Sequence, residues 1–206
     1  MKIAIYGATG NVGRHLVTEA ARRGHTVTAL SRHQAELPLG VEWLHGDLAD
    51  AEGVAAIASG HDAVVTANGP GREPGGDPFA FAALVVQVAE AVGTTRLVVV
   101  GGAGSLLAAP GVRLVDTPEF PTEYKQEALA SAAALDYLRS TSNLDWTYLS
   151  PAPVFPSGEA TGSYVVGIDS PVGMSISGED FARALIDELE NPLHRTSRFT
   201  VAAAGA

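Results

Sequence analysis

Three glycines stand at every third position directly after a short apolar run. Residues 2–6 read as a strand buried on both faces, and Gly7, Gly10 and Gly13 follow it. Gly7 lets the chain turn off the strand, Gly10 lets a ligand approach the backbone without meeting a Cβ, and Gly13 lets a helix pack close to the sheet. A helix that starts near Asn11 would direct its free N–H groups and the positive end of its dipole at a phosphate. The residues of this turn that we expect to bind a dinucleotide are Gly7, Thr9, Gly10, Asn11, Val12 and Gly13. The alternative is a domain that keeps the turn but has lost the ligand.

The segments after the next two predicted strands indicate which dinucleotide is bound. Ser31 and Arg32 follow the strand Thr26–Leu30, at the place where an adenosine ribose would lie, and no Asp or Glu ends that strand. The positive charge of Arg32, with no Asp or Glu beside it, suits a 2′-phosphate. We therefore expect NADP(H) to be preferred, with NAD(H) possible. The alternative is that Arg32 is a solvated loop residue. Asp47 and Leu48 follow a third strand beside the expected adenine pocket. Asp47 either accepts from the adenine amine or serves as a loop or helix-capping carboxylate.

Two further strand ends complete the predicted binding edge. Asn68 and Gly69 follow the apolar strand Ala63–Ala67, and Gly101 and Gly102 follow the strand Arg96–Val100. Ligands of open parallel sheets bind outside the carboxyl ends of the strands, so these residues would border the ribose and the nicotinamide. Small residues after the fifth strand would leave room for a flat ring. Ser105 could then offer a hydroxyl to a substrate carbonyl or to the nicotinamide side, unless it is an ordinary loop serine.

Strands and helices alternate along the chain, which predicts the α/β class. We expect one doubly wound, mainly parallel Rossmann sheet over residues 1–206, with helices on both faces and a first-half strand order of 3-2-1-4-5. A small elaboration over about residues 151–180, with an extra strand at 163–167, would close the substrate side. The lid would come from Leu106 to Pro121 and from residues 151–156, which we expect to be irregular. We expect residues 72–78 to form a surface loop. Side chains that could stack on a flat substrate, or simply belong to the core, are Leu114, Phe120 and Phe155.

Composition narrows the class of protein further. The 206 residues carry a formal charge of −10 and no Lys/Arg-rich run, which argues against nucleic acid as a partner. No apolar run reaches membrane-spanning length and no signal peptide is evident, so we expect no membrane attachment and a cytoplasmic location. The absence of cysteine excludes disulfides and a cysteine nucleophile, and the six histidines lack ligand spacing, so no metal site is expected. The expected partner is a small-molecule substrate, with the protein a monomer or a homodimer.

Several motifs together carry a resemblance to a known family. They are the glycine turn, Ser31-Arg32, Gly46-Asp47, the run Gly101 to Ser105, and the segment Leu144 to Pro151. With them the chain resembles the atypical short-chain dehydrogenase/reductases, and among these the small NAD(P)H-binding proteins known as NADH-flavin reductases. It is also similar to the biliverdin-IXβ/flavin reductases and to cofactor-sensing regulators of that superfamily. The resemblance extends to a helix beginning near Ser177 and a terminal strand at 198–201, and it implies the fold and the cofactor far better than the substrate.

One departure from the larger family bears on chemistry. Its acid/base pair is a Tyr followed four residues later by a Lys, and no tyrosine of this chain has that partner. Tyr124 and Lys125 are adjacent at the start of a helix, where neighbours point in different directions and cannot work as the spaced pair does. The candidate catalytic residues are therefore Ser105, Tyr124 and Lys125. Lys125 could reach a nicotinamide ribose, or it could be a solvated lysine of the first turn.

Three functions fit the sequence. The first is an NADPH-dependent reductase of flavins, quinones or other conjugated acceptors, which take hydride with little help from a protein acid. The second is a non-catalytic NADP(H)-sensing regulator, suggested by the missing Tyr/Lys pair. The third is an epimerase, dehydratase or ketoreductase with a recruited acid/base. Ser105 lacks the strand-turn-helix setting of a hydrolase serine.

Overall fold

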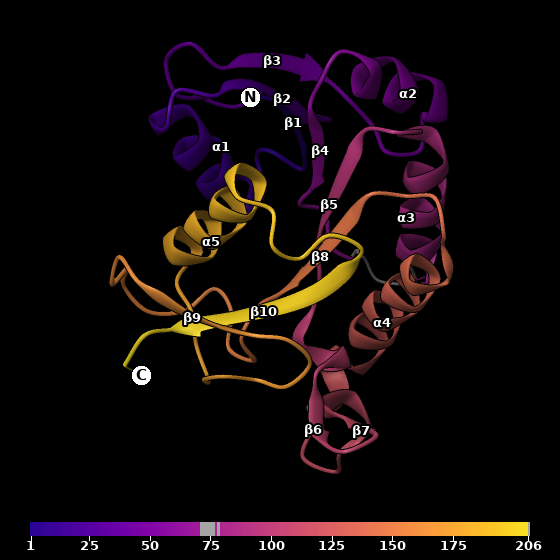
Figure 1. Ribbon diagram of the computed structural model, residues 1–206, viewed down its shortest axis with the longest axis vertical. Coiled ribbons are helices and arrows are strands. Elements are labelled where there is room, and N and C mark those ends of the chain that lie inside the picture. Colours follow the sequence, from indigo (N-terminus) through magenta and orange to yellow (C-terminus); the bar gives the residue numbers. More distant parts are fainter. Residues whose placement is uncertain (71–76, 78, 206) are drawn as a thin grey trace.

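An eight-stranded sheet forms the centre of the protein. The computed structural model describes residues 1–70, 77 and 79–205, and the sheet has the order β3-β2-β1-β4-β5-β8-β10-β9 (Figure 1). Its strands are β1 (Lys2–Tyr6), β2 (Thr26–Ser31), β3 (Glu42–His45), β4 (Ala63–Thr66), β5 (Arg96–Val100), β8 (Trp146–Ser150), β9 (Tyr164–Gly167) and β10 (Ser197–Ala203). Every adjacent pair is parallel except β9 with β10, which is antiparallel.

This topology confirms the doubly wound α/β fold that the sequence predicts. The first five strands run in the order 3-2-1-4-5, and the extra strand near residue 163 exists as β9 at the sheet edge. β4, β5 and β8 are buried along their whole length, as strands covered by helices on both faces should be. The carboxyl ends of β1, β2, β3, β4 and β5 consequently meet at one edge of the sheet.

Helices cover both faces of the sheet. On one face α1 (Gly13–Arg22) packs against α5 (Gly178–Glu190), over a core that includes Ile3, Ile5 and Phe199. On the other face lie α2 (Ala51–Ser59), α3 (Ala80–Ala91) and α4 (Lys125–Ser140), as Figure 1 shows. The two faces thus hold separate apolar clusters, and the residues after each strand emerge between these helical layers.

Polar contacts fix α5 near both of its ends. The Ser177 hydroxyl accepts from the amide of Asp180 at 3.0 Å and caps the helix. Near its end, Glu188 forms an ion pair with Arg96 of β5 at 2.6 Å, and both side chains are at most 5% exposed. Removing one partner of such a buried pair typically costs about 3–5 kcal/mol, because the other charge stays buried and unpaired. This pair therefore ties α5 to the sheet just before the chain enters β10.

The segment that we expected to be an irregular lid is partly regular. β6 (Leu107–Ala109) and β7 (Val112–Arg113) pair as an antiparallel hairpin, turned at Gly111 with φ +76°. Three short 3₁₀ turns flank it: η1 (Ala103–Ser105), η2 (Leu114–Asp116) and η3 (Thr122–Tyr124). The expectation of an irregular segment was wrong here because strands of two or three residues leave no periodic signal.

Two expectations concern the rest of the surface. The predicted loop at residues 72–78 lies, apart from Asp77, outside the described residues. Within residues 1–70 and 79–205, no helix is both long and apolar enough to cross a membrane.

Candidate functional site

The three glycines of the first turn differ in what a Cβ at each position would contact. Gly7 has φ +73°, and a Cβ there would lie 2.8 Å from Asn68 Oδ1. A Cβ at Gly13 would lie only 2.0 Å from the carbonyl oxygen of Gly7. At Gly10 the one neighbour within 4 Å of such a Cβ, in the described part of the chain, is that same oxygen, at 3.2 Å. The packing of the protein itself requires glycine at positions 7 and 13, whereas at position 10 it leaves the Cβ position nearly open.

Backbone amides before and after Gly10 in the turn lack hydrogen-bond acceptors among the described residues. The Gly10 amide donates to the Gly7 carbonyl at 3.0 Å, which closes the turn. In the part of the chain that the structure describes, four amides of the turn have no hydrogen-bond acceptor, namely those of Thr9, Asn11, Val12 and Gly13. Thr9, Gly10 and Asn11 are exposed, and α1 begins at Gly13, two residues later than the sequence predicts. Free N–H groups at an exposed helix start are suited to an anion such as a pyrophosphate.

The end of β2 is shaped by a contact that the sequence did not suggest. The Ser31 hydroxyl donates to the carbonyl of His33 at 2.7 Å and accepts from the indole N–H of Trp43 on β3 at 2.9 Å. Its proton is thus already used, so in this arrangement Ser31 shapes the turn and has no donor to offer an anion. Arg32 is exposed, and among the described residues no carboxylate pairs with its guanidinium.

Two aspartates follow β3, Asp47 and Asp50. We had left open whether Asp47 accepts from adenine or serves as a loop or helix-capping carboxylate. Asp50 caps α2 by accepting from the amide of Gly53 at 3.0 Å. Asp47 is exposed, and its Oδ1 accepts from the amide of Ala49 at 3.0 Å, which makes it a loop-ordering carboxylate with one oxygen to spare. Leu48 is buried at 4% exposure and packs in the core on the α3 side.

Asn68 is the strongest polar signal at the end of β4. Its Oδ1 is buried and has no hydrogen-bond donor among the described residues, although buried polar atoms are nearly always paired. It lies against Gly7, at the centre of the edge where the turn emerges. A hydroxyl or amide of a bound ligand would satisfy this oxygen. Gly69 beside it is exposed, and no atom of the described residues other than its chain neighbours lies within 4 Å of its Cβ position.

The space beside Gly101 is filled by a side chain of the protein, the ring of Tyr148. A Cβ at Gly101 would lie 1.9 Å from the ring of Tyr148, so the glycine is needed for Tyr148 to pack. The Tyr148 hydroxyl accepts from the amide of Gly102 at 3.2 Å and donates to the carbonyl of Ser131 at 2.9 Å. Complete burial raises the pKa of Tyr148 to about 12. Gly101 therefore does not leave the room for a flat ring that we expected, and Tyr148 positions the Gly101-Gly102 backbone.

Ser105 points into a cavity of its own. Its hydroxyl accepts from Arg198 Nη1 at 3.3 Å, and the two line a cavity of about 190 Å³. We call it the arginine cavity; its polar lining consists of Ser105, Arg113, Asp136, Arg139, Asp169 and Arg198. Burial would raise the pKa of Asp169, but hydrogen bonds and charges from Arg198 and Arg139 outweigh it and hold the pKa below its usual range. The sequence signal that could have predicted this cluster is Arg198, a charged residue inside the mostly apolar run at 197–203.

The other two catalytic candidates lie on the surface. Tyr124 ends η3 and is 45% exposed, and Lys125 is the exposed first residue of α4. The pKa of Asp116 is lowered first by its hydrogen bond with Arg113 and, to a lesser degree, by the charge of Lys125. Neither Tyr124 nor Lys125 lines the arginine cavity. Ser105 thus lines the arginine cavity, whereas Tyr124 and Lys125 do not, and the three candidates form no common cluster there.

The three side chains expected to stack on a substrate are only partly buried. Phe155 packs against the core on the α1 side, with its ring 4.6 Å from that of Phe181. This contact supports the core interpretation for Phe155. Leu114 is the first residue of η2, Phe120 follows the end of η2 by four residues, and both are half-buried.

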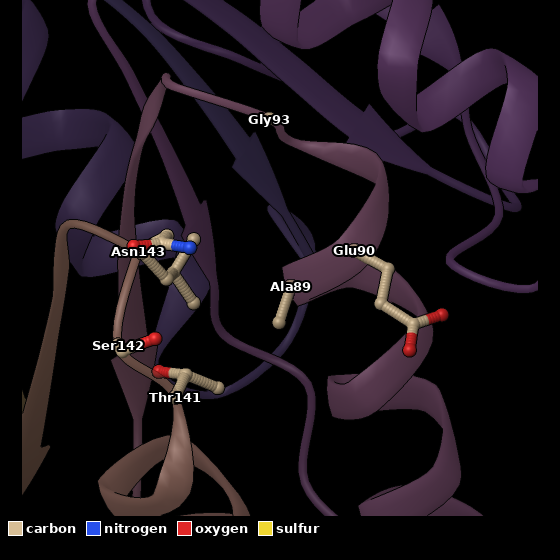
Figure 2. Close-up of a pocket in the computed structure, with 7 residues that line it drawn as sticks. Ala89, Glu90, Gly93, Thr141, Ser142 and Asn143 are labelled. Atoms are coloured by element: carbon tan, nitrogen blue, oxygen red, sulfur yellow. The ribbon is translucent and has the colours of Figure 1, made fainter.

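A larger cavity lies at the opposite edge of the sheet. It has a volume of about 320 Å³ and is framed by the ends of α3 and α4, with Glu90 on one side and Thr141, Ser142 and Asn143 on the other (Figure 2). These segments precede β5 and β8, whereas ligands of such sheets bind beyond the carboxyl ends of the strands. Its position therefore argues against an active site there despite its size.

The residues at the carboxyl edge fit a dinucleotide. The free amides of the glycine turn, the open Cβ position of Gly10 and the unpaired Asn68 oxygen supply an anion site and a polar contact where a doubly wound sheet holds its nucleotide. The class that the fold and this edge define is a nucleotide-binding Rossmann protein.

Comparison with known proteins identifies the family. The sequence model of the NAD(P)H-binding family matches residues 7–192, and the chain belongs to that family. This membership confirms the nicotinamide dinucleotide cofactor that the sequence predicts, without deciding between NADP(H) and NAD(H).

Three solved structures are similar over nearly the whole chain. A protein from Burkholderia pseudomallei, named provisionally as exported, has 42% identity and a TM-score of 0.87 and covers 98% of this chain and 100% of its own. A protein from Streptococcus pneumoniae, named provisionally as an NADH-flavin reductase, has 35% identity and a TM-score of 0.89 over 98% of this chain and 99% of its own. A protein from Bacteroides thetaiotaomicron, named provisionally as an epimerase, has 35% identity and a TM-score of 0.87 over 100% and 98%. The relatives agree in fold and differ in their named activities.

Proposed function

We propose that the protein is an NADPH-dependent oxidoreductase that reduces flavins, quinones or other conjugated small-molecule acceptors. The observation that carries the proposal is how the hydroxyl groups of Tyr148 and Ser105 are hydrogen-bonded near the end of β5. Tyr148 is fully buried with both its donor and its acceptor in use, and Ser105 faces Arg198. Tyr148 has no free proton to exchange with a substrate oxygen, and Ser105 contacts a cation rather than a base that could activate it, so an acceptor that needs little acid assistance suits the site best.

The chain's own residues would bind and orient the reactants. The free amides of Asn11, Val12 and Gly13 would hold the pyrophosphate, and Asn68 would accept from a ribose hydroxyl. When bound, the reduced nicotinamide would supply a hydride to a conjugated ring, for which solvent can provide the proton. Positioning would then account for most of the rate.

Arg32 supports the choice of NADPH over NADH. Its exposed guanidinium has no carboxylate partner among the described residues, and the Ser31 contacts order the turn that carries it. A free guanidinium at the end of β2 suits a 2′-phosphate, which it can contact through two parallel hydrogen bonds.

A non-catalytic NADP(H)-sensing regulator is the second candidate. The fully hydrogen-bonded Tyr148 hydroxyl favours it, because a protein that only binds the cofactor needs no acid or base. An epimerase, dehydratase or ketoreductase, the kind of activity named for the Bacteroides relative, would instead need Ser105, Tyr124 or Lys125 as a recruited acid or base.

A screen of acceptors with the purified protein tests these functions. We expect NADPH oxidation to be faster with flavins and quinones than with isolated ketones, and Tyr124→Phe and Lys125→Gln to change the rate only mildly. Loss of nearly all activity in Tyr124→Phe with intact NADPH affinity would favour a recruited acid. Tight NADPH binding without reduction of any acceptor would favour the regulator.

Location and assembly are also part of the proposal. We propose a cytoplasmic protein, monomeric or homodimeric, that acts on a small molecule and binds neither nucleic acid nor membrane; the charge of −10 and the lack of cysteine support this. Immunoblots of fractionated source cells would test the compartment, which matters because the Burkholderia relative is named as exported. Light scattering would give the oligomeric state.

A further inference from the structure

The arginine cavity combines a buried floor with an open rim. At its floor the Arg198 side chain is 1% exposed and contacts Ser105, itself 6% exposed. At its rim the side chains of Arg113 and Arg139 are 35% and 46% exposed. Arg113 comes from the β6–β7 hairpin, which stands beside the start of α4 in Figure 1, and Arg139 comes from the last turn of α4. A small polar group could therefore enter from solvent and reach the buried arginine.

The charges around this cavity do not cancel within its lining. Three guanidinium groups face two carboxylates, those of Asp136 and Asp169, while a third carboxylate, Asp116, pairs with Arg113 just outside the lining. One atom, Asp169 Oδ1, accepts from both Arg139 and Arg198, so a single carboxylate serves two cations. Each cation has a carboxylate near it, but three guanidinium groups gathered around one concave surface are suited to an anion.

Hydrogen-bond donors remain for such an anion. Arg113 uses Nε and Nη2 on Asp116, and Arg139 uses Nη2 on Asp169. Within the described part of the chain, Arg113 Nη1 and both Nε and Nη1 of Arg139 have no acceptor. The Ser105 oxygen accepts from Arg198, which leaves the hydroxyl proton available to donate. Guanidinium and hydroxyl donors around one small space are the groups that recognise a carboxylate or a phosphate.

The cavity lies within reach of the proposed reaction site. Ser105 is three residues beyond Gly102, and three residues span at most about 11 Å even when fully extended. The η1 turn, which contains Ser105, shortens that distance further. A ring held beyond the end of β5 could therefore carry a short side chain that ends in this cavity.

We propose that the arginine cavity binds an oxyanion substituent, a carboxylate or a phosphate, of the acceptor that the protein reduces. The inference rests on the proposed reductase function and adds a substrate class to it: conjugated rings with an acidic side chain. Arg198 and Ser105 form the base of this subsite, and Arg113 and Arg139 close its rim. No residue of the cavity takes part in hydride transfer.

Two pairs of flavins test the proposal, because each pair shares one ring and differs in charge. Riboflavin and FMN differ by a phosphate, and lumiflavin and lumiflavin-3-acetate differ by a carboxylate, so the two pairs distinguish the oxyanions. We expect the protein to prefer at least one charged member. Arg113→Gln and Arg139→Gln should each raise the KM for that member about tenfold, as loss of a charge-assisted hydrogen bond does, and leave the KM of its neutral partner unchanged.

A matched arginine serves as the control. Arg195 is 57% exposed and pairs with Asp145 at 2.6 Å, just before β8 and at the opposite edge of the sheet. Arg195→Gln removes the same charge from the protein but should leave the preference between charged and neutral flavins intact. Equal KM values within both wild-type pairs, or an equal loss of preference in Arg195→Gln, would overturn the proposal.

Direct binding separates this proposal from the reductase function. Calorimetric titration of the NADPH-free protein with the same flavins needs no turnover, so it reports on the subsite even if no acceptor is reduced. Tighter binding of a charged flavin that both rim variants abolish would support the subsite by itself. Turnover of flavins with no effect of charge in either assay would reject the subsite and leave the reductase function standing.

Discussion

Replacing Gly10 by valine should separate cofactor binding from folding. Among the residues that the structure describes, the only neighbour within 4 Å of a Cβ at this position is the Gly7 carbonyl oxygen at 3.2 Å, a contact that a shift of a few tenths of an ångström relieves. Stability should therefore fall by less than about 1 kcal/mol, which for a chain of this size lowers Tm by no more than about 4 °C. The branched side chain would instead stand among the free amides of Asn11 and Val12 and keep a pyrophosphate from them.

Loss of those contacts should weaken NADPH binding at least about 100-fold, equivalent to about 2.7 kcal/mol. Fluorescence titration gives the Kd, and thermal unfolding followed by circular dichroism gives Tm. Gly13→Ala is the matched contrast: its Cβ would lie 2.0 Å from the Gly7 oxygen, so it should destabilise the fold by about 3 kcal/mol, the upper range for overpacking. A Gly10→Val protein that binds NADPH within about threefold of wild type, less than 1 kcal/mol, would refute this reading of the turn.

Three further predictions follow from single contacts. Arg32→Ala should weaken NADPH by about 1.5–3 kcal/mol and leave NADH nearly unchanged, and equal losses in a binding titration would reject the 2′-phosphate role. Tyr148→Phe should cost about 1–3 kcal/mol in urea unfolding because the Gly102 amide loses its buried acceptor, and unchanged stability would contradict that role. The hydrogen bond from Arg22 is the main cause that lowers the pKa of Glu19 from 4.5 to about 2. The stability that this carboxylate contributes should be present above pH 4.5 and lost as the pH falls towards 2. Between pH 6 and pH 3 the free energy of unfolding should therefore fall less in Glu19→Gln than in the wild type. An equal fall in both proteins would exclude Glu19 as a source of the pH dependence.

Local rules predicted the nucleotide half of the molecule from the sequence. Strand, glycine turn and helix follow one another within Lys2 to Arg22, and the parallel crossovers fix the order of the first five strands. The ends of those strands must meet at one edge, so the residues there could be named without knowing any contact across the sheet. The helix start was displaced only by two residues, because turn residues 11 and 12 precede the first helical residue, Gly13.

Contacts between distant segments could not be predicted in this way. Gly101 resembled a space for a ligand ring, but a side chain 47 positions later, Tyr148, occupies it. Ser105 resembled a catalytic hydroxyl, but it meets Arg198, which lies 93 positions away on β10. Such pairs depend on how β8 and β10 join the sheet, which no local pattern encodes. The single warning in the sequence was a charged residue inside an otherwise apolar strand.

Stereospecific deuterium transfer tests the proposed reductase function most directly. NADPH deuterated at C4 in either the R or the S position would be oxidised by the purified protein with a flavin or quinone acceptor. We expect acceptor-dependent oxidation that deuterium slows in only one of the two isomers, because a nicotinamide held at the carboxyl edge presents one face to the acceptor. Tight binding of NADPH with no oxidation above the protein-free rate, for any acceptor, would contradict the reductase and leave a cofactor-binding regulator.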